Sequence, residues 1–240
     1  MPVQTSCPSL VIDVVTIFPE MFTAWRGAGV VGKAVESGRV AVRAHDLRAW
    51  SQDKHRKTDD YPFGGGAGMV MCPEPLFAAV DSLCAGDSTV ILMSPRGPVL
   101  TQSMARSLAA RKHLILLCGR YEGVDERVHE HLVDLEISIG DYILSGGELA
   151  AMVVAEATMR LLPGVLGDAE SLEQDSFAPG HGMLGWPQYT RPREYRGLAV
   201  PDVLLSGNHA QIAAWRREQA RELTGRLRPD LLREPAAHEE

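Results

Sequence analysis

Residues 137–148 read ISIGDYILSGGE, a strand end, a glycine-rich turn and a helix start of the kind found in α/β proteins. It begins at the end of an apolar run typical of a buried strand, Val133–Ile139, and continues as a turn with three glycines. A helical pattern then runs to about Leu162. In α/β proteins such a turn between strand and helix often holds a small polar ligand. An isolated Gly-Gly pair more often only turns the chain. The sequence at the other strand ends is therefore needed to judge whether this turn belongs to a ligand site.

Four more short apolar runs predict strands of the same sheet: Leu10–Ile17, Val40–Ala44, Thr89–Met93 and Leu114–Cys118. Patterns typical of helices lie between them: Val30–Ser37, Pro73–Leu83, Thr101–Arg111 and Val124–His131. Short apolar strands that alternate with helices predict an α/β fold with a mostly parallel sheet, covered by helices on both faces.

Three of the predicted strands end in polar, Gly-rich sequence: SPRG at 94–97, GRYEG at 119–123, and the turn at 140–147. The carboxyl ends of parallel strands lie at one edge of a sheet, and ligands bind outside that edge. We therefore expect these three segments to form one pocket.

The helix after Gly147 has an apolar stripe that periodicity places at Ala150, Val153, Val154, Ala157 and Leu161. Arg160 falls near this stripe in the last turn. Arg favours a helix C-terminus and can pair with Glu156 four residues earlier, so Arg160 has a structural explanation beside a functional one.

The composition is ordinary for a globular protein: 240 residues, 45% hydrophobic and 23% charged. No apolar run approaches the roughly 18–20 residues of a membrane helix, and the N-terminus has no secretory pattern. The four cysteines are scattered without a C-x-x-C pair, which argues against structural zinc and for reduced thiols. We therefore expect a cytoplasmic protein with no membrane partner.

Charge is distributed unevenly along the chain, although its net value is −7. Residues 120–175 carry thirteen acids against three arginines, whereas 181–228 carry eight arginines against four acids. Residues 39–57 carry six bases against two acids. Basic segments on either side of an acidic middle favour an anionic partner. Solvated surface arginines explain the charge equally well.

The sequence after residue 162 changes in character. Residues 165–186 are acidic and lack periodicity, which indicates a functional loop or a linker. A helix with Asn208 as its N-cap is predicted to end near Thr224, with Gly225 as the stop. Its predicted buried side is marked by Ile212, Trp215 and Leu223.

Several common motifs are absent. The glycines at 64–68 have the wrong spacing and context for a dinucleotide fingerprint, and there is no P-loop. His129 and His131 lack the H-E-x-x-H spacing of a zinc protease. There is no G-x-S-x-G elbow and no Gly-rich signature of Rossmann-type methyltransferases.

Long motifs give the chain a resemblance. They are GRYEGVDER at 119–127, SIGDYILSGGEL at 138–149, PGVLG at 163–167, DSF at 175–177, YTRP at 189–192 and LLSGNHA at 204–210. Together they resemble the bacterial tRNA (guanine-N1)-methyltransferases that act at position 37 of the anticodon loop, which belong to the SPOUT superfamily. The resemblance extends from Asp13 to about Arg228.

The resemblance implies an α/β fold of the SPOUT type with a trefoil knot, a small helical C-terminal domain and a homodimer. The expected domains are a donor-binding domain over 1–162, a flexible linker or active-site loop over 163–186 and a helical tRNA-binding domain over 187–240. The implied cofactor is S-adenosylmethionine, bound in the knot. Its implied contacts are Ser94, Pro95, Gly119, Tyr121, Glu122, Ser138, Ile139, Gly140, Asp141, Tyr142, Ile143, Leu144, Gly146 and Gly147.

The resemblance also implies the chemistry at the acceptor. Guanine N1 carries a proton, which a carboxylate can remove, and charge then develops on O6. The matching positions are Asp175 as general base and Arg160 as the O6 stabiliser. The implied tRNA contacts are Lys54, Arg56, Arg191, Ser206, Asn208 and His209. The family is stimulated by Mg²⁺, but no dedicated metal cage is evident, so an ion would use Glu122 or a neighbouring acid.

One departure is that GWPQ at 185–188 stands where the family usually has an acidic residue and a Cys-Pro-His-Tyr run. It leaves open which residue there touches the guanine. Two alternatives remain: another SPOUT RNA methyltransferase, such as a ribose 2′-O enzyme, and a non-catalytic tRNA-binding module. Identifying the nucleoside that the protein methylates separates all three.

Overall fold

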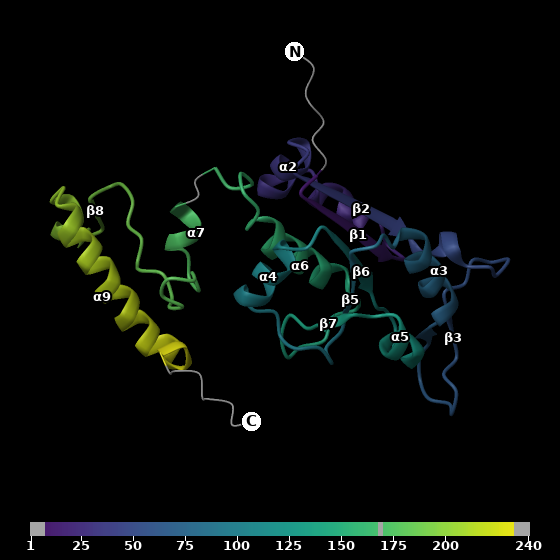
Figure 1. Cartoon of the computed structure of the whole chain (residues 1–240). Helices are drawn as coiled ribbons and strands as arrows, with labels where there is room; N and C mark the ends of the chain where they lie inside the picture. The colour runs from purple at the N-terminus through teal and green to yellow at the C-terminus, as the bar shows by residue number, and fades with distance from the viewer. Residues whose placement is uncertain (1–7, 168–169, 233–240) are drawn as a thin grey trace, which may run out of the picture. The chain divides into compact units, whose positions relative to one another are not determined.

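The predicted strands form one sheet in which every neighbouring pair is parallel, in the order β2-β1-β6-β5-β7 (Figure 1). The strands are β1 (Leu10–Thr16), β2 (Val40–Asp46), β5 (Ser88–Met93), β6 (His113–Cys118) and β7 (Leu135–Ile137). The computed structural model describes residues 8–167 and 170–232. The chain divides into a first unit, residues 1–167, and a second unit, residues 168–240. The predicted mostly parallel α/β sheet is confirmed and lies in the first unit.

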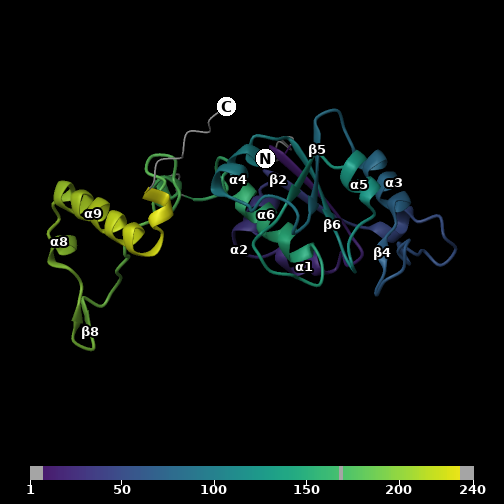
Figure 2. The same cartoon turned by 90° about the horizontal axis from the view of Figure 1, so that it is seen from below.

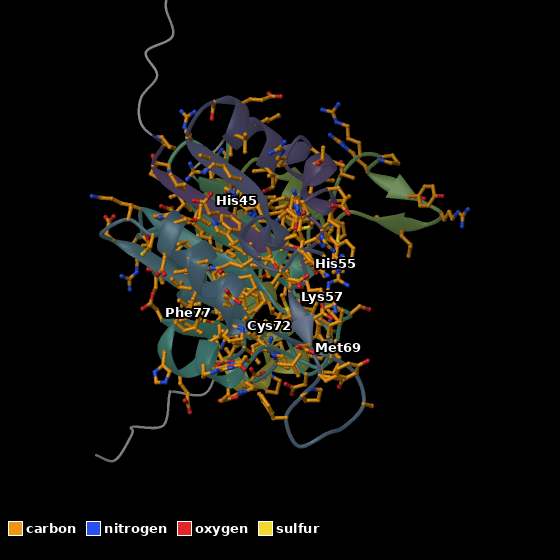
Figure 3. All side chains as sticks on the ribbon, turned by 90° about the vertical axis from the view of Figure 1, so that its right-hand side faces the viewer. His45, His55, Lys57, Met69, Cys72 and Phe77 are labelled. Atoms are coloured by element: carbon orange, nitrogen blue, oxygen red, sulfur yellow. The ribbon has the colours of Figure 1, made fainter. Side chains whose placement is uncertain are left out.

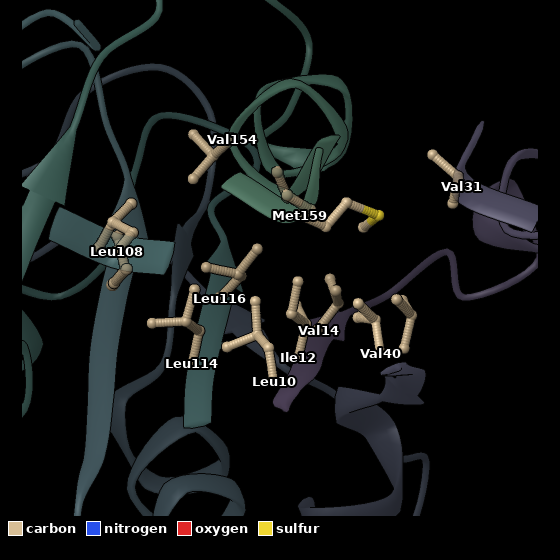
Figure 4. Close-up of a cluster of buried hydrophobic side chains, with 14 of the residues drawn as sticks. Leu10, Ile12, Val14, Val31, Val40, Leu108, Leu114, Leu116, Val154 and Met159 are labelled. Carbon is tan, nitrogen blue, oxygen red and sulfur yellow. The ribbon is translucent and has the colours of Figure 1, made fainter. Parts of the chain in front are cut away.

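Both faces of the sheet are buried, as continuous apolar strands require. On one face Leu10, Ile12 and Val14 of β1 pack in a cluster with Leu114 and Leu116 of β6 (Figure 4). The alternate residues, including Val15 and Leu117, pack in a second cluster on the other face. Because successive side chains of a strand point to opposite faces, the central strand β6 is buried along its whole length.

Helices cover the two faces unequally (Figure 2). The first cluster is covered by α1 (Met21–Trp25), α2 (Gly29–Glu36), α4 (Gln102–Ala109) and α6 (Glu148–Met159). The second cluster is covered by α3 (Pro73–Leu83) and α5 (Glu126–His131), with the short helix η1 (Leu47–Trp50). All the predicted helices of the first unit are present, and α3 has the predicted bounds.

The predicted face of α6 is confirmed at Ala150 and Val154, which are buried, but it is wrong at Val153, which is 46% exposed. The core side also includes Ala151, Ala155, Thr158 and Met159. The helix is apolar over most of its circumference, so its sequence period does not select one face. The predicted strand at 133–139 is also too long, because only residues 135–137 pair with β5. A small hairpin of β3 (Asp59–Asp60) and β4 (Val70–Met71) was not predicted.

The second unit contains α7 (Glu170–Gln174), β8 (Glu194–Tyr195), β9 (Leu198–Ala199), α8 (Asp202–Leu205), α9 (His209–Leu227) and η2 (Pro229–Leu232). The Asn208 side chain caps α9 by accepting from the Gln211 backbone N–H at 3.2 Å, as predicted. The predicted stop at Gly225 is wrong, since α9 continues to Leu227. The predicted inner residues Ile212, Trp215 and Leu223 are half-buried.

Part of the expected linker packs within the second unit. The Leu184 backbone N–H donates to Thr224 Oγ1 of α9 at 3.0 Å, and Arg216 lies 4.9 Å over the Trp186 ring. Among the residues that the structure describes, no helix is both long and apolar enough to cross a membrane.

Candidate functional site

A pocket of about 480 Å³ lies at the carboxyl ends of β5, β6 and β7. All three predicted segments line it: 94–96, 119–124 and 138–147 without Asp141. This volume falls in the usual range for small-molecule sites. The expectation that three strand ends form one pocket is therefore confirmed.

Thirteen of the fourteen residues expected to hold a donor line the pocket. They are Ser94, Pro95, Gly119, Tyr121, Glu122, Ser138, Ile139, Gly140, Tyr142, Ile143, Leu144, Gly146 and Gly147. Asp141 is exposed and is not a lining residue. The pocket thus combines apolar side chains, carboxylates and a long stretch of accessible backbone.

The turn after β7 is held by local hydrogen bonds. The Ser138 hydroxyl donates to the Gly140 carbonyl at 3.1 Å, and Ser138 Oγ accepts from the Gly140 N–H at 3.1 Å. Gly140 has a φ of +144°, which an L side chain rarely adopts. The Tyr142 hydroxyl donates to the Ile139 carbonyl at 3.2 Å, so the turn folds back on itself.

A buried ion pair joins the two longest motifs. Glu148, at the start of α6, is 1% exposed, and its carboxylate accepts from Arg120 Nε at 3.0 Å and lies 2.9 Å from Arg120 Nη2. The Thr16 hydroxyl at the end of β1 donates to the same carboxylate at 2.7 Å. Arg120 also donates to the Ser145 carbonyl at 3.2 Å. Glu148 therefore ties together β1, the segment after β6 and the turn before α6.

Gly146 and Gly147 permit this close approach. The Gly147 N–H donates to the Gly119 carbonyl at 2.9 Å. A Cβ at Gly147 would lie 2.9 Å from Cys118 Cα and Met93 Cβ, and one at Gly146 would overlap the Arg120 guanidinium. The second glycine of this pair is thus required by packing of α6 against the ends of β5 and β6.

The electrostatics of the pocket are set by its rim. Burial raises the pKa of the Tyr121 hydroxyl, and the Asp59 carboxylate beside it raises that pKa further. Tyr121 has a φ of +60°, which places it in the left-handed region. Arg96 and Glu126 form a bidentate pair at 2.7 and 2.8 Å across the rim, and the hydrogen bond from Arg96 lowers the pKa of Glu126.

Sequence reasoning missed several lining residues. They are Leu92, Met93, Val124, Glu126, His129, Ile137 and Ala150. Most are chain neighbours of predicted residues, so the same strand-end signal would have found them. Glu126 and His129 come from α5, and no local pattern places that helix at the pocket.

Arg160 lies at the end of α6 opposite the pocket. Glu148 begins the helix at the pocket, and Arg160 is its C-cap, where its N–H donates to the Glu156 carbonyl at 3.1 Å. Twelve residues of helix span about 18 Å at 1.5 Å per residue. Arg160 is accordingly not a lining residue of this pocket.

The other predicted residues lie in two regions. Lys54 and Arg56 are exposed on the first unit, before β3. Asp175 is half-buried in the second unit, directly after α7, and its carbonyl accepts from the Ala178 N–H at 3.3 Å. Arg191, Ser206, Asn208 and His209 are exposed on the second unit, and Ser206 Oγ accepts from the Asn208 N–H at 3.1 Å. Within residues 8–167 and 170–232, no three His, Cys, Asp or Glu side chains form a group that could hold a metal ion.

Comparison with known proteins gives a consistent result. A family model described as tRNA (guanine-1)-methyltransferase TrmD matches residues 10–234. A Moorella thermoacetica protein named tRNA (guanine-N(1)-)-methyltransferase is 59% identical over 225 residues, covering 92% of this chain and 89% of that protein. Proteins with the same name from Dictyoglomus turgidum and Halalkalibacterium halodurans are both 53% identical, over 95% and 92% of this chain and 92% and 90% of their own lengths.

Proposed function

The chain belongs to the tRNA (guanine-N1)-methyltransferase family, and on that premise we propose that it methylates N1 of the guanosine at position 37 of tRNA. The observation that carries the proposal is the pocket itself. Three separate strand-end segments line one cavity of about 480 Å³ at the carboxyl end of the sheet, and two of them, 119–124 and 138–147, belong to motifs on which the resemblance rests.

We propose S-adenosylmethionine as the ligand of this pocket. When bound, it supplies an already activated methyl group. Ile139 and Leu144 offer apolar walls to an adenine ring, and the backbone of 138–144 offers donors and acceptors to its edge. Glu122 and Ser94 offer polar contacts to the ribose and amino-acid ends. The lining residues therefore fit the mixed chemistry of this donor.

Asp175 and Arg160 are proposed to act on the acceptor. The Asp175 carboxylate takes the proton from guanine N1, and the Arg160 guanidinium stabilises the negative charge that develops on O6. Asp175 follows the short helix α7, and Arg160 follows the last turn of α6. Arg160 is thus the C-cap of α6, and Asp175 is the first residue of the irregular segment after α7.

The position of Arg160 supports a homodimer. Since Arg160 lies about 15 Å of helix beyond Ala150, the last α6 residue that lines the pocket, we propose that Arg160 serves the pocket of a partner subunit. The exposed side of α6 presents Leu149 and Val153, which are 50% and 46% exposed, and nearby elements present Met21 and Val30, both 37% exposed. A helix that is apolar on its outer side is typical of an interface. Mixing an Arg160 variant with a pocket variant should then restore part of the activity.

The trefoil knot is proposed from how the turn after β7 passes its neighbours. At its start, the Ser138 N–H donates to the Pro98 carbonyl at 3.1 Å and the Leu100 N–H donates to the Ser138 carbonyl at 2.8 Å. At its end, Gly147 bonds with Gly119. The turn is thus bonded at its start to the segment after β5 and at its end to the segment after β6. This arrangement supports threading, a rare exception to un-knotted folds.

The anionic partner is proposed to bind the basic regions. Lys54 and Arg56, together with Arg191 and the α9 N-terminus at Ser206, Asn208 and His209, would contact tRNA phosphates. Any Mg²⁺ would use Glu122 with substrate oxygens. We expect the reaction to occur in the cytoplasm, where tRNA is used.

The test is to incubate the protein with labelled S-adenosylmethionine and tRNA transcripts that carry G or A at position 37. We expect 1-methylguanosine from the first transcript and no product from the second. Asp175→Ala should lower turnover by about 10²–10⁴-fold while calorimetry still detects donor binding. Glu173→Ala is the matched control, an exposed acid two residues away that should keep full turnover. Any other methylated nucleoside contradicts the proposal, and loss of donor binding in Asp175→Ala would make Asp175 a structural residue.

A further inference from the structure

The glycine-rich loop, residues 61–68, connects β3 to β4 (β3 is labelled in Figure 1). Both ends of the loop are fixed. Asp59 pairs with Met71 in the hairpin, the Glu122 N–H donates to the Met69 carbonyl at 3.0 Å, and the Met71 N–H donates to the Gly123 carbonyl at 2.9 Å. Since Glu122 and Gly123 line the pocket, the loop starts where the pocket wall ends.

The tip of the loop presents an aromatic ring to solvent. Phe63 is 102% exposed and Tyr61 is 79% exposed. The ring is held out by a tight turn, in which the Gly65 N–H donates to the Pro62 carbonyl at 3.2 Å. Gly64, Gly65 and Gly66 all have positive φ, and no atom lies within 4 Å of a Cβ placed on any of them. A phenyl group with no packing around it, beside a ligand pocket, leaves apolar area that burial against a partner would stabilise.

The chain next to the loop is basic. Lys54, His55, Arg56 and Lys57 are exposed. Figure 3 labels His55 and Lys57 on the side of the molecule where Met69, directly after the loop, is also labelled. Asp53, directly before this run, accepts from the backbone N–H groups of His55 and Lys57 at 2.7 and 3.4 Å, and Asp59 and Asp60 stand between the run and the loop. Protein surfaces that bind single-stranded RNA combine cationic side chains, which contact phosphates, with exposed aromatic rings, on which bases stack.

We propose that Phe63 stacks on an unpaired base of the tRNA anticodon loop, adjacent to the guanosine that enters the pocket. This inference rests on the proposed function. A target base that leaves its stack exposes the faces of its neighbours. Because the loop is fixed to the pocket wall, the Phe63 ring lies close to the position of a base next to the bound guanosine. The glycines of the loop let a nucleotide backbone approach without Cβ interference. Phe63 acts here as a positioning residue for the RNA and takes no part in methyl transfer.

A substitution series at Phe63 tests the stacking. Phe63→Ala should raise KM for tRNA by about 5- to 150-fold, as alanine replacement of base-stacking rings does, with kcat at saturating tRNA and donor Kd unchanged. Phe63→Leu keeps apolar bulk but has no π face, so it should behave like Phe63→Ala. Phe63→Trp should retain wild-type KM, and its added fluorescence should be quenched by tRNA but not by a minihelix that lacks the anticodon arm.

Three other results overturn the inference. Wild-type KM in Phe63→Leu would mean that the ring is covered by general apolar burial. A weaker subunit association of Phe63→Ala in sedimentation would mean that a second copy covers it, and a raised donor Kd would mean that the loop closes over the donor. Failure of the proposed function is distinguishable, because the wild-type protein would then form no 1-methylguanosine in the same assay.

Discussion

Replacing Glu148 tests whether the pocket depends on the ion pair beneath it. Glu148 is 1% exposed, the Arg120 side chain is 18% exposed, and the carboxylate also accepts from Thr16. Glu148→Ala removes one partner of a buried pair and leaves a guanidinium without its carboxylate, which costs about 3–5 kcal/mol. Glu148→Gln keeps the volume and one acceptor but turns charge-assisted hydrogen bonds into neutral ones, so about 1–2 kcal/mol should be lost.

The assay is thermal unfolding followed by circular dichroism, with donor binding measured in parallel by calorimetry. At about 2–4 °C per kcal/mol for a unit of this size, Glu148→Ala should lower Tm by about 6–20 °C and Glu148→Gln by about 2–8 °C. Donor affinity should fall in the same order, because Arg120 holds the Ser145 carbonyl at the pocket rim. Glu36→Ala, at an exposed position of α2, should change Tm by no more than about 2 °C. If Glu148→Ala also changed Tm by no more than about 2 °C, the reasoning would be refuted.

Three further predictions concern the rest of the chain. Asp13 is fully buried, and although burial alone raises its pKa, hydrogen bonds from His45, Arg43 and His113 lower it to about 2. Since this folded-state pKa is below the ordinary 3.8, the stabilisation of about 2 kcal/mol is present above about pH 4 and is lost as pH falls towards 2. In Asp13→Asn, the urea concentration at the unfolding midpoint should therefore fall less steeply between pH 7 and pH 3 than in the wild-type protein. An equally steep fall in both proteins would disprove this. Gly147→Ala should lower donor affinity in calorimetry and cost about 1–3 kcal/mol in denaturant unfolding through its contacts at 2.9 Å, whereas Gly167→Ala, which meets nothing within 4 Å, should do neither. Asn208→Ala should cost about 0.5–2 kcal/mol of second-unit stability in urea unfolding, with Asn208→Asp close to wild type; equal losses would argue against capping.

The first unit could be predicted well because its signals are local. The strand pattern at 10–16, 88–93 and 113–118 follows from apolar, β-branched runs, and α3 has Pro at its start. The pocket followed from one general rule, that ligands bind at the carboxyl ends of parallel strands. The second unit was less predictable, because its short elements α7, β8 and β9 have too few residues to show a period.

The sequence by itself determined the strands, the three strand-end segments and, through long motifs, the family. Only the tertiary structure decided which face of α6 is buried, since an almost wholly apolar helix has no preferred face until it packs. It also revealed that Glu148 is bound to Arg120 and Thr16, residues 28 and 132 positions away in the chain. Arg160 illustrates the difference best. It follows the pocket motif closely in sequence, but the length of α6, about 18 Å, separates it from Glu148 at the pocket end of the helix. A periodic pattern records what each residue faces locally, whereas contacts between distant segments depend on how those segments pack together.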